Sequence, residues 1–301
     1  MNVAAPLSPA RAHKLIAARL APDRKIKQSR SLGDTLIRMG CLSAEQVDRI
    51  LEVQNKKGGV FGKIAVRLGF LTPQDLQYAL GVQLGFLHEA EGPAVIPASL
   101  MVARNPYSPQ AEQIKQMRTR LITGFSAETL KLFSISAAGA RTDAAYVAAN
   151  LAASFAQIGR QVLLIDADLR KPKFSKIFGE PDAPGLSDLI RGDASYEEIC
   201  RATLIKNLNL LPAGAHSPDP QMLLGAKGFS KLLEQARKTH DIVIVLTAPF
   251  GAAADGEFVW AATRSVFALA RKHHTRAKTL SQMRSAIRSV GAEIIGAAMV
   301  A

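Results

Sequence analysis

Long hydrophobic runs are absent from this sequence, and cysteine is scarce. Glycine, proline or a charged residue interrupts every apolar run well before 18 residues, which excludes a membrane-spanning helix. Cys41 and Cys200 lie far apart, so they suggest neither a disulfide framework nor a metal-binding cluster, and we expect a reducing cytoplasm. The basic amino terminus lacks the apolar core and the cleavage site of a signal peptide.

Acidic residues are missing from two basic stretches. The chain has 38 Lys and Arg against 25 Asp and Glu, a net charge of +13. Only Asp23 opposes the cations of residues 1–30, and no acid lies between Glu257 and Glu293. Basic stretches of this kind suit anionic lipid, nucleic acid or an acidic protein. Because no nucleic-acid fold signature or interleaved aromatic residue accompanies them, we expect a membrane surface or a protein partner and not nucleic acid.

Residues 161–172, QVLLIDADLRKP, combine a buried strand with acidic residues. Residues 162–165 are apolar, as in a strand that is covered on both faces. Asp166 and Asp168 follow at the carboxyl end, which is where open α/β sheets hold their ligands. Paired carboxylates there can hold hydrated Mg²⁺ or polarise a nucleophile. The simpler interpretation is a strand end with solvated acids.

An internal repeat occupies residues 31–54 and 60–83, and the two copies align without gaps. Each copy predicts a short helix, a turn stopped by glycine and a second helix, with Ser43 and Thr72 as N-caps. Stacked helix pairs would bury Leu36, Ile37, Val47 and Leu51 and their counterparts. Periodicity alone therefore predicts a small helical interaction domain.

The spacing of the repeat resembles the duplicated motif that binds cyclic-di-GMP in type II secretion and type IV pilus ATPases. The glycines and glutamines of that motif are present, whereas Ser31 and Val60 replace its leading arginines and Arg30 is adjacent. The resemblance implies cyclic-di-GMP as a ligand. The positions that it implies for dinucleotide binding are Arg30, Leu32, Gly33, Leu36, Ile37, Gly40, Leu51, Gln54, Phe61, Gly62, Val66, Gly69, Leu80 and Gln83.

Strand and helix patterns alternate from residue 132 onward. Strands are expected at 132–136, 162–165, 207–213, 241–246, 265–270 and 293–300, with helices to about 158, near 220–238 and over 276–290. This order predicts an α/β fold with a mostly parallel sheet and helices on both faces. We therefore expect a flexible basic arm (1–30), a duplicated helical domain (31–84), a linker with a basic helix (85–130) and an α/β domain (131–301).

Ordered motifs after residue 105 resemble bacterial tyrosine autokinases of the capsule and exopolysaccharide type, which have a P-loop fold. They are QMRTRL at 116–121, the D-x-D-x-R-x-P pattern at 166–172, and the stretches 185–195 and 211–224. With the repeat in front, the chain resembles the exosortase-associated subgroup. The resemblance implies a membrane-anchored chain-length (co-polymerase) protein as partner, self-association or an active kinase paralogue. It also implies contacts through Arg118, Arg120 and Arg170.

The phosphate-binding loop departs from the G-x-x-x-x-G-K-[ST] pattern of this family. Aligned on the helical stretch AANLA at 148–152, the loop positions are Gly139, Arg141, Asp143, Ala144 and Ala145. Asp143 replaces the last glycine, Ala144 the phosphate-binding lysine and Ala145 the Mg²⁺-binding hydroxyl. A carboxylate beside a triphosphate is repulsive, so we do not expect ATP or Mg²⁺ to be ligands.

Two further catalytic features of the family are missing. Leu246 replaces the acid of the Walker B strand, and no tyrosine cluster precedes Ala301. Because phosphoryl transfer depends on positioning and electrostatic stabilisation, we predict a catalytically inactive homologue that docks on the chain-length protein at the inner membrane, gated by cyclic-di-GMP. Two alternatives are an unconventional autokinase or ATPase that uses Asp166 and Asp168, and a partition-type ATPase. A third is a hetero-oligomer in which the chain lends groups to an active paralogue.

Overall fold

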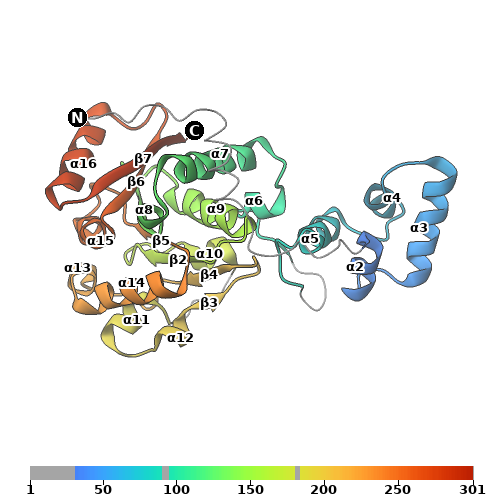
Figure 1. The fold of residues 1–301 in the computed structure, drawn as a ribbon, viewed down its shortest axis with the longest axis horizontal. Helices are drawn as coiled ribbons and strands as arrows, with labels where there is room; N and C mark the ends of the chain where they lie inside the picture. Colours follow the sequence, from blue (N-terminus) through green and yellow to red (C-terminus); the bar gives the residue numbers. More distant parts are fainter. Residues whose placement is uncertain (1–30, 90–94, 180–183, 301) are drawn as a thin grey trace.

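The computed structural model describes residues 31–89, 95–179 and 184–300 (Figure 1). It consists of a helical part near the amino terminus and a larger α/β part. The basic arm predicted for residues 1–30, including Arg30, lies outside the described residues. Within them, no helix is both long and apolar enough to cross a bilayer.

Four helices occupy the repeat: α2 (Leu32–Arg38), α3 (Ala44–Lys57), α4 (Phe61–Arg67) and α5 (Pro73–Gln83). The predicted N-caps are present. Ser43 and Thr72 each form a capping box, in which the side chain accepts from an amide of the first turn and a residue of that turn accepts from the cap amide. Gly40 and Gly69 follow the first helix of each copy with φ of +69° and +73°, a conformation that favours glycine.

The two other motif glycines permit close helix packing. A Cβ atom on Gly33 would lie 3.2 Å from Val47, and one on Gly62 would lie 2.5 Å from Leu76. The prediction that Leu36 is buried is confirmed, but Ile37 and Leu51 are 39% and 41% exposed, so their predicted burial is wrong. Helix α2 packs on α5, and α3 packs on α4. The two copies therefore cover each other, but they bury fewer side chains than the repeat predicted.

The α/β part is built on a seven-stranded sheet in the order β3-β4-β2-β5-β1-β6-β7. The strands are β1 (Leu132–Ala137), β2 (Val162–Ala167), β3 (Arg201–Ala202), β4 (Leu208–Leu211), β5 (Ile242–Thr247), β6 (Ser265–Arg271) and β7 (Glu293–Val300). All neighbouring strands pair in parallel except β3 with β4, which pair antiparallel. The central strands β1, β2 and β5 consist entirely of buried residues, and β6 does so except at its two ends. Their apolar runs predicted strands that are covered on both faces.

Helices cover both faces of this sheet, which confirms the predicted fold class (Figure 1). One face packs against α7 (Pro109–Gly124) and α9 (Ala144–Gln157), with α6 (Met101–Arg104), α8 (Ala127–Leu130) and α10 (Phe174–Phe178) nearby. The other face packs against α11 (Leu186–Arg191), α14 (Lys227–Thr239), α15 (Asp255–Thr263) and α16 (Ala277–Ser289). The short helices α12 (Tyr196–Ile199) and α13 (Pro220–Leu224) lie beside α11.

Two features of the α/β part differ from the prediction. The helix expected near 220–238 is interrupted at Gly225 and Ala226, and α13 and α14 are separate. The short antiparallel strand β3 was not predicted, and the turn that follows it pairs with the segment after α5. There the amide of Lys206 donates to the carbonyl of Phe86, and the amide of His88 donates to the carbonyl of Leu204. This pairing ties the helical part to one edge of the sheet.

Candidate functional site

The candidate site lies at the carboxyl edge of the parallel strands. The loop 138–143 connects β1 to α9 there, and Asp166 and Thr247 stand at the ends of the neighbouring strands β2 and β5. Gly139 has φ +121° and thereby turns the loop out of β1. Asp166 thus lies near the carboxyl end of a parallel strand, where the sequence placed it, and the sheet order brings the loop 138–143 and Thr247 to the same edge.

Asp143 caps the helix that this loop introduces. Its Oδ1 atom accepts a hydrogen bond of 3.2 Å from the amide of Tyr146, and Lys173 Nζ lies 3.9 Å from the same oxygen. The amino end of a helix is a ready anion site, because its first amides are unpaired and its dipole is positive. In this chain a carboxylate of the chain itself takes that place, and Ala144 and Ala145 next to it are buried.

Asp166 is buried beneath the loop that follows β2. Its side chain is 1% exposed, and its oxygens accept from the amides of Asp168 (3.2 Å), Lys173 (3.0 Å) and Phe174 (3.2 Å). Burial raises the pKa of Asp166 to about 7, although these three amides act in the opposite direction. The interpretation of Asp166 as a solvated acid is therefore wrong, and the residue fastens the loop to the strand.

The remaining charged residues of this loop are also held within the chain. Asp168 accepts from the amide of Lys171 at 3.2 Å, and burial raises its pKa. Arg170 forms a bidentate ion pair with Asp255 on α15, at 2.5 and 3.1 Å. Asp255 is almost fully buried, whereas Arg170 is partly exposed. No local sequence pattern indicates this pair, because its members are 85 residues apart.

The side chains of the site supply few ligands of their own for a Mg²⁺ ion. Both oxygens of Asp166 already accept backbone amides, and the position opposite it on β5 is the buried Leu246. Across the described ranges, no group of three His, Cys, Asp or Glu side chains forms a potential metal site. A triphosphate would also find no lysine side chain from the loop. A Mg²⁺ ion at this edge would depend on oxygens from a bound nucleotide or from water.

A groove of about 1130 Å³ runs from the loop 138–143 along α7 to β7. Its floor includes Ile114, Leu121 and Ile295, and its rim carries the cations Arg120, Arg141, Arg271 and Lys272 and the single acid Asp143. Arg271 Nη1 donates to the carbonyl of Arg141 at 3.0 Å and so joins β6 to the loop. Arg271 and Lys272 were not predicted as members of the site, because their proximity to the loop depends on the strand order.

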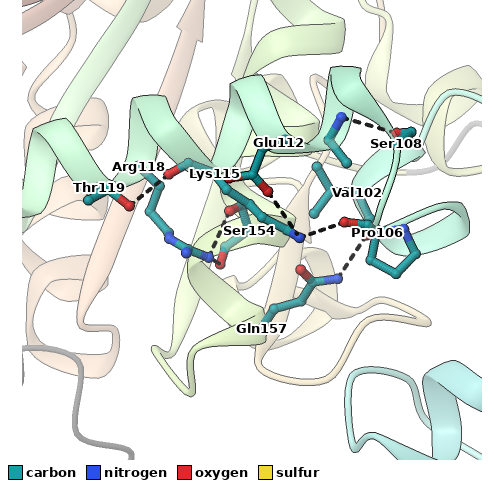
Figure 2. A network of polar contacts seen from close by, with 10 residues as sticks. Val102, Pro106, Ser108, Glu112, Lys115, Arg118, Thr119, Ser154 and Gln157 are labelled. Atoms are coloured by element: carbon teal, nitrogen blue, oxygen red, sulfur yellow. Dashed lines mark hydrogen bonds and ion pairs between the residues drawn. The ribbon is translucent and has the colours of Figure 1, made fainter.

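The basic helix α7 directs one of its predicted contact residues inward (Figure 2). Arg118 Nη1 donates to the carbonyl and the hydroxyl of Ser154 on α9, at 2.9 and 3.0 Å, and burial lowers the pKa of Arg118. Lys115 Nζ donates to the carbonyl of Pro106 at 2.5 Å and lies 3.7 Å from Glu112. Of the predicted partner contacts, Arg118 and Arg170 are thus engaged within the chain, and Arg120 is exposed.

The positions predicted for dinucleotide binding divide into buried and exposed groups. Leu36 and the four glycines serve helix packing and turns, as described above. Gln54 Nε2 donates to the carbonyl of Gly59 at 2.9 Å, within the link between the two copies. The equivalent residues Leu51 and Leu80 are 41% and 38% exposed, so apolar surface recurs at the same place in each copy.

The sheet order and the loop between β1 and α9 define the class of the α/β part, which has a P-loop NTPase-like fold. The homologues of the chain are bacterial tyrosine-protein kinases. The tyrosine-protein kinase ptk of Acinetobacter johnsonii is 30% identical over 197 residues, which cover 65% of this chain and 27% of that protein. YwqD of Bacillus subtilis is 29% identical over 201 residues, which cover 67% of this chain and 85% of YwqD.

A solved kinase domain has the same fold. The kinase domain of the Escherichia coli tyrosine kinase ETK superposes with a TM-score of 0.64 at 27% identity and covers 66% of this chain and 78% of that domain. No family model matches the chain. The chain spans about a quarter of the length of ptk and most of the length of YwqD.

These comparisons correct one sequence prediction. We did not expect ATP and Mg²⁺ to be ligands, but the relatives and the structural neighbour are kinases, and kinases act on Mg·ATP. The expectation is contradicted. The residues of the loop 138–143 do not by themselves exclude a nucleotide.

Proposed function

We propose that the chain is a tyrosine-autokinase homologue that has lost phosphoryl transfer and acts as a docking protein in polysaccharide assembly. The observation that carries the proposal is Asp143, whose carboxylate caps α9 at the position where a phosphate would need the helix amides. Ala144, Ala145 and Leu246 supply none of the charged or hydroxyl groups that phosphoryl transfer requires. Since single electrostatic groups of this kind contribute about 10²–10³-fold in rate, their joint absence removes most of the catalysis.

A labelling experiment tests the loss of transfer. Purified chain is incubated with radiolabelled Mg·ATP and a synthetic tyrosine-containing polymer, and nucleotide binding is measured separately by calorimetry. We expect no label above that of Asp166→Asn. A chain with a rebuilt site (Asp143→Gly, Ala144→Lys, Ala145→Thr and Leu246→Asp) should label the polymer more strongly. Label in the natural chain that disappears in Asp166→Asn would instead make it an active kinase.

The docking partner that we propose is a membrane-anchored chain-length (co-polymerase) protein, with the chain peripheral to the inner membrane. The support is the kinase-like scaffold together with the exposed Arg120 on α7. We expect the tagged chain to co-purify with such a protein from solubilised membranes, and Arg120→Glu to reduce recovery. Recovery of an active kinase paralogue without a chain-length protein would support the hetero-oligomer alternative.

We further propose that cyclic-di-GMP gates this docking through the helical part. The observation that favours it is the exposed apolar pair Leu51 and Leu80 at equivalent positions of the repeat. In a calorimetric titration with cyclic-di-GMP, we expect the double change Leu51→Asp and Leu80→Asp to weaken binding at least tenfold, because buried contact area of about two leucines is lost. Leu84→Asp, at an exposed leucine outside the motif, is the matched control. No heat of binding in the natural chain would refute the gating.

A further inference from the structure

Among the described residues, positive charge gathers on α16, on the loop that precedes it and at the end of α15. The exposed cations of this basic surface are Arg264, Lys272, Arg276, Lys278, Arg284 and Arg288. In the part of the chain that the structure describes, none of the six forms an ion pair with a carboxylate. The surface therefore keeps its full charge available for a partner.

Helix α16 anchors this surface firmly on the sheet. Met283 and Ile287 are buried against β6, with Leu280 and Ala286 beside them, so the helix has a distinct inner face. The cations Lys278, Arg284 and Arg288 are exposed on the remaining surface. An amphipathic helix with this division keeps its charged face outward, so its backbone need not become ordered on binding.

The charge at the start of α16 disfavours the helix itself. Arg276 occupies the N-cap without a side-chain hydrogen bond, and the first turn contains Lys278 and no acidic residue. Cations near the positive end of a helix dipole are destabilising, and a Ser or Asp cap would add about 1 kcal/mol. Folding alone therefore does not explain these cations, whereas an anionic partner would offset their cost.

Exposed apolar side chains lie on the same side of the sheet. Ile294 pairs with Val266 and Met299 with Ala270, and the buried residues Val266 and Ala268 of that face of β6 contact the α16 layer. Met299 is 65% exposed and Ile294 is 38% exposed. Figure 1 shows β7 next to α16 at this edge of the molecule.

We infer that α16 and the outer edge of β7 form a surface that binds a membrane rich in anionic lipid. Cations attract the headgroups, and exposed apolar side chains beside them enter the interface, a combination that nucleic-acid phosphates do not require. Such a surface would bind lipid directly and would need no protein in the membrane, unlike the docking proposed above. It also supplies the site through which the chain would remain at the membrane surface.

Vesicle flotation tests this surface. The full chain is mixed with vesicles of three parts phosphatidylethanolamine to one part phosphatidylglycerol, and with vesicles of phosphatidylcholine only. We expect binding to the anionic vesicles alone, and its loss in high salt. The triple change Lys278→Glu, Arg284→Glu and Arg288→Glu should reduce partitioning by about 100-fold or more, since each basic residue near such a surface contributes roughly fivefold.

A matched control separates the position of the charge from its amount. Lys227→Glu, Lys231→Glu and Lys238→Glu change the net charge equally on the exposed side of α14, and we expect them to affect binding far less. Arg276→Asp should raise the melting temperature while weakening vesicle binding, which a damaged fold could not do. Equal losses in the α14 and α16 variants would overturn the inference. So would an α16 variant that loses binding to duplex DNA but keeps binding to vesicles.

Discussion

Replacing Gly185 with alanine is expected to lower the free energy of unfolding by about 3 kcal/mol or more. A Cβ atom at this position would lie 2.2 Å from the carbonyl oxygen of Pro212 and 2.5 Å from the amide nitrogen of Gly214. Both contacts are to backbone, so neither can be relieved by a side-chain rotation, and overpacking of this kind is costly. The amides of Leu186 and Ser187 also donate to Pro212 and Ala213 here, and a shift would break those bonds.

Urea unfolding measures this effect, with Gly124→Ala as the control. Gly124 ends α7, and a Cβ atom there would meet nothing within 4 Å. Alanine favours the helix over glycine by about 0.5–1 kcal/mol, so the control should be neutral or slightly more stable. If Gly185→Ala were as stable as Gly124→Ala, the close backbone packing between the start of α11 and the segment after β4 would be refuted.

The second large effect is a loss of stability as the pH rises through the neutral range. The pKa of Asp166 is raised by burial to about 7 from an ordinary value of 3.8, so the folded chain holds a proton that the unfolded chain releases. Between these values the unfolded state binds fewer protons, and the free energy of unfolding falls with rising pH. The full shift corresponds to on the order of 4 kcal/mol. Asp166→Asn removes this titration and should flatten the profile.

Unfolding at pH 5 and pH 8 provides the measurement, and Asp188 provides a contrast of opposite sign. Burial alone would raise the pKa of Asp188, but the amides of Gly185 and Ala215 and the guanidinium of Arg191 lower it. Its contribution is present above the ordinary pKa of a carboxyl group and is lost as the pH falls. Asp188→Asn should therefore leave the slope between pH 5 and pH 8 almost unchanged. Parallel profiles for the natural chain and Asp166→Asn would contradict the assignment.

Local sequence patterns were sufficient for much of this fold. The apolar runs of β2 and β5 identified the central strands, because strands buried on both faces need continuous apolar residues. Ser43 and Thr72 identified the starts of α3 and α5, because capping depends on residues within one turn. The interruption between α13 and α14 was missed, since Gly225 packs against Phe258, which lies far away in the sequence.

The candidate site was predictable in its position but not in its contacts. The D-x-D pattern placed Asp166 at the correct edge, and the alignment placed Asp143 at the start of α9. No pattern indicated that Asp166 is enclosed by the amides of its own loop, or that Arg170 reaches Asp255. These contacts depend on where loops fold back in three dimensions, and that information is not contained in the periodicity of any single segment.

The two edges of the sheet differ in a way that limits how copies of the chain could assemble. On one side, β3 is only two residues long, and residues 86–88 pair with the turn that follows it. On the other side, β7 extends over eight residues, and among the described residues a strand neighbours it on one side only. Edge-to-edge association would therefore join β7 to β7 about a two-fold axis. A sheet extended in this way ends at β3 on both sides, so such an assembly closes as a dimer and cannot grow into a fibre.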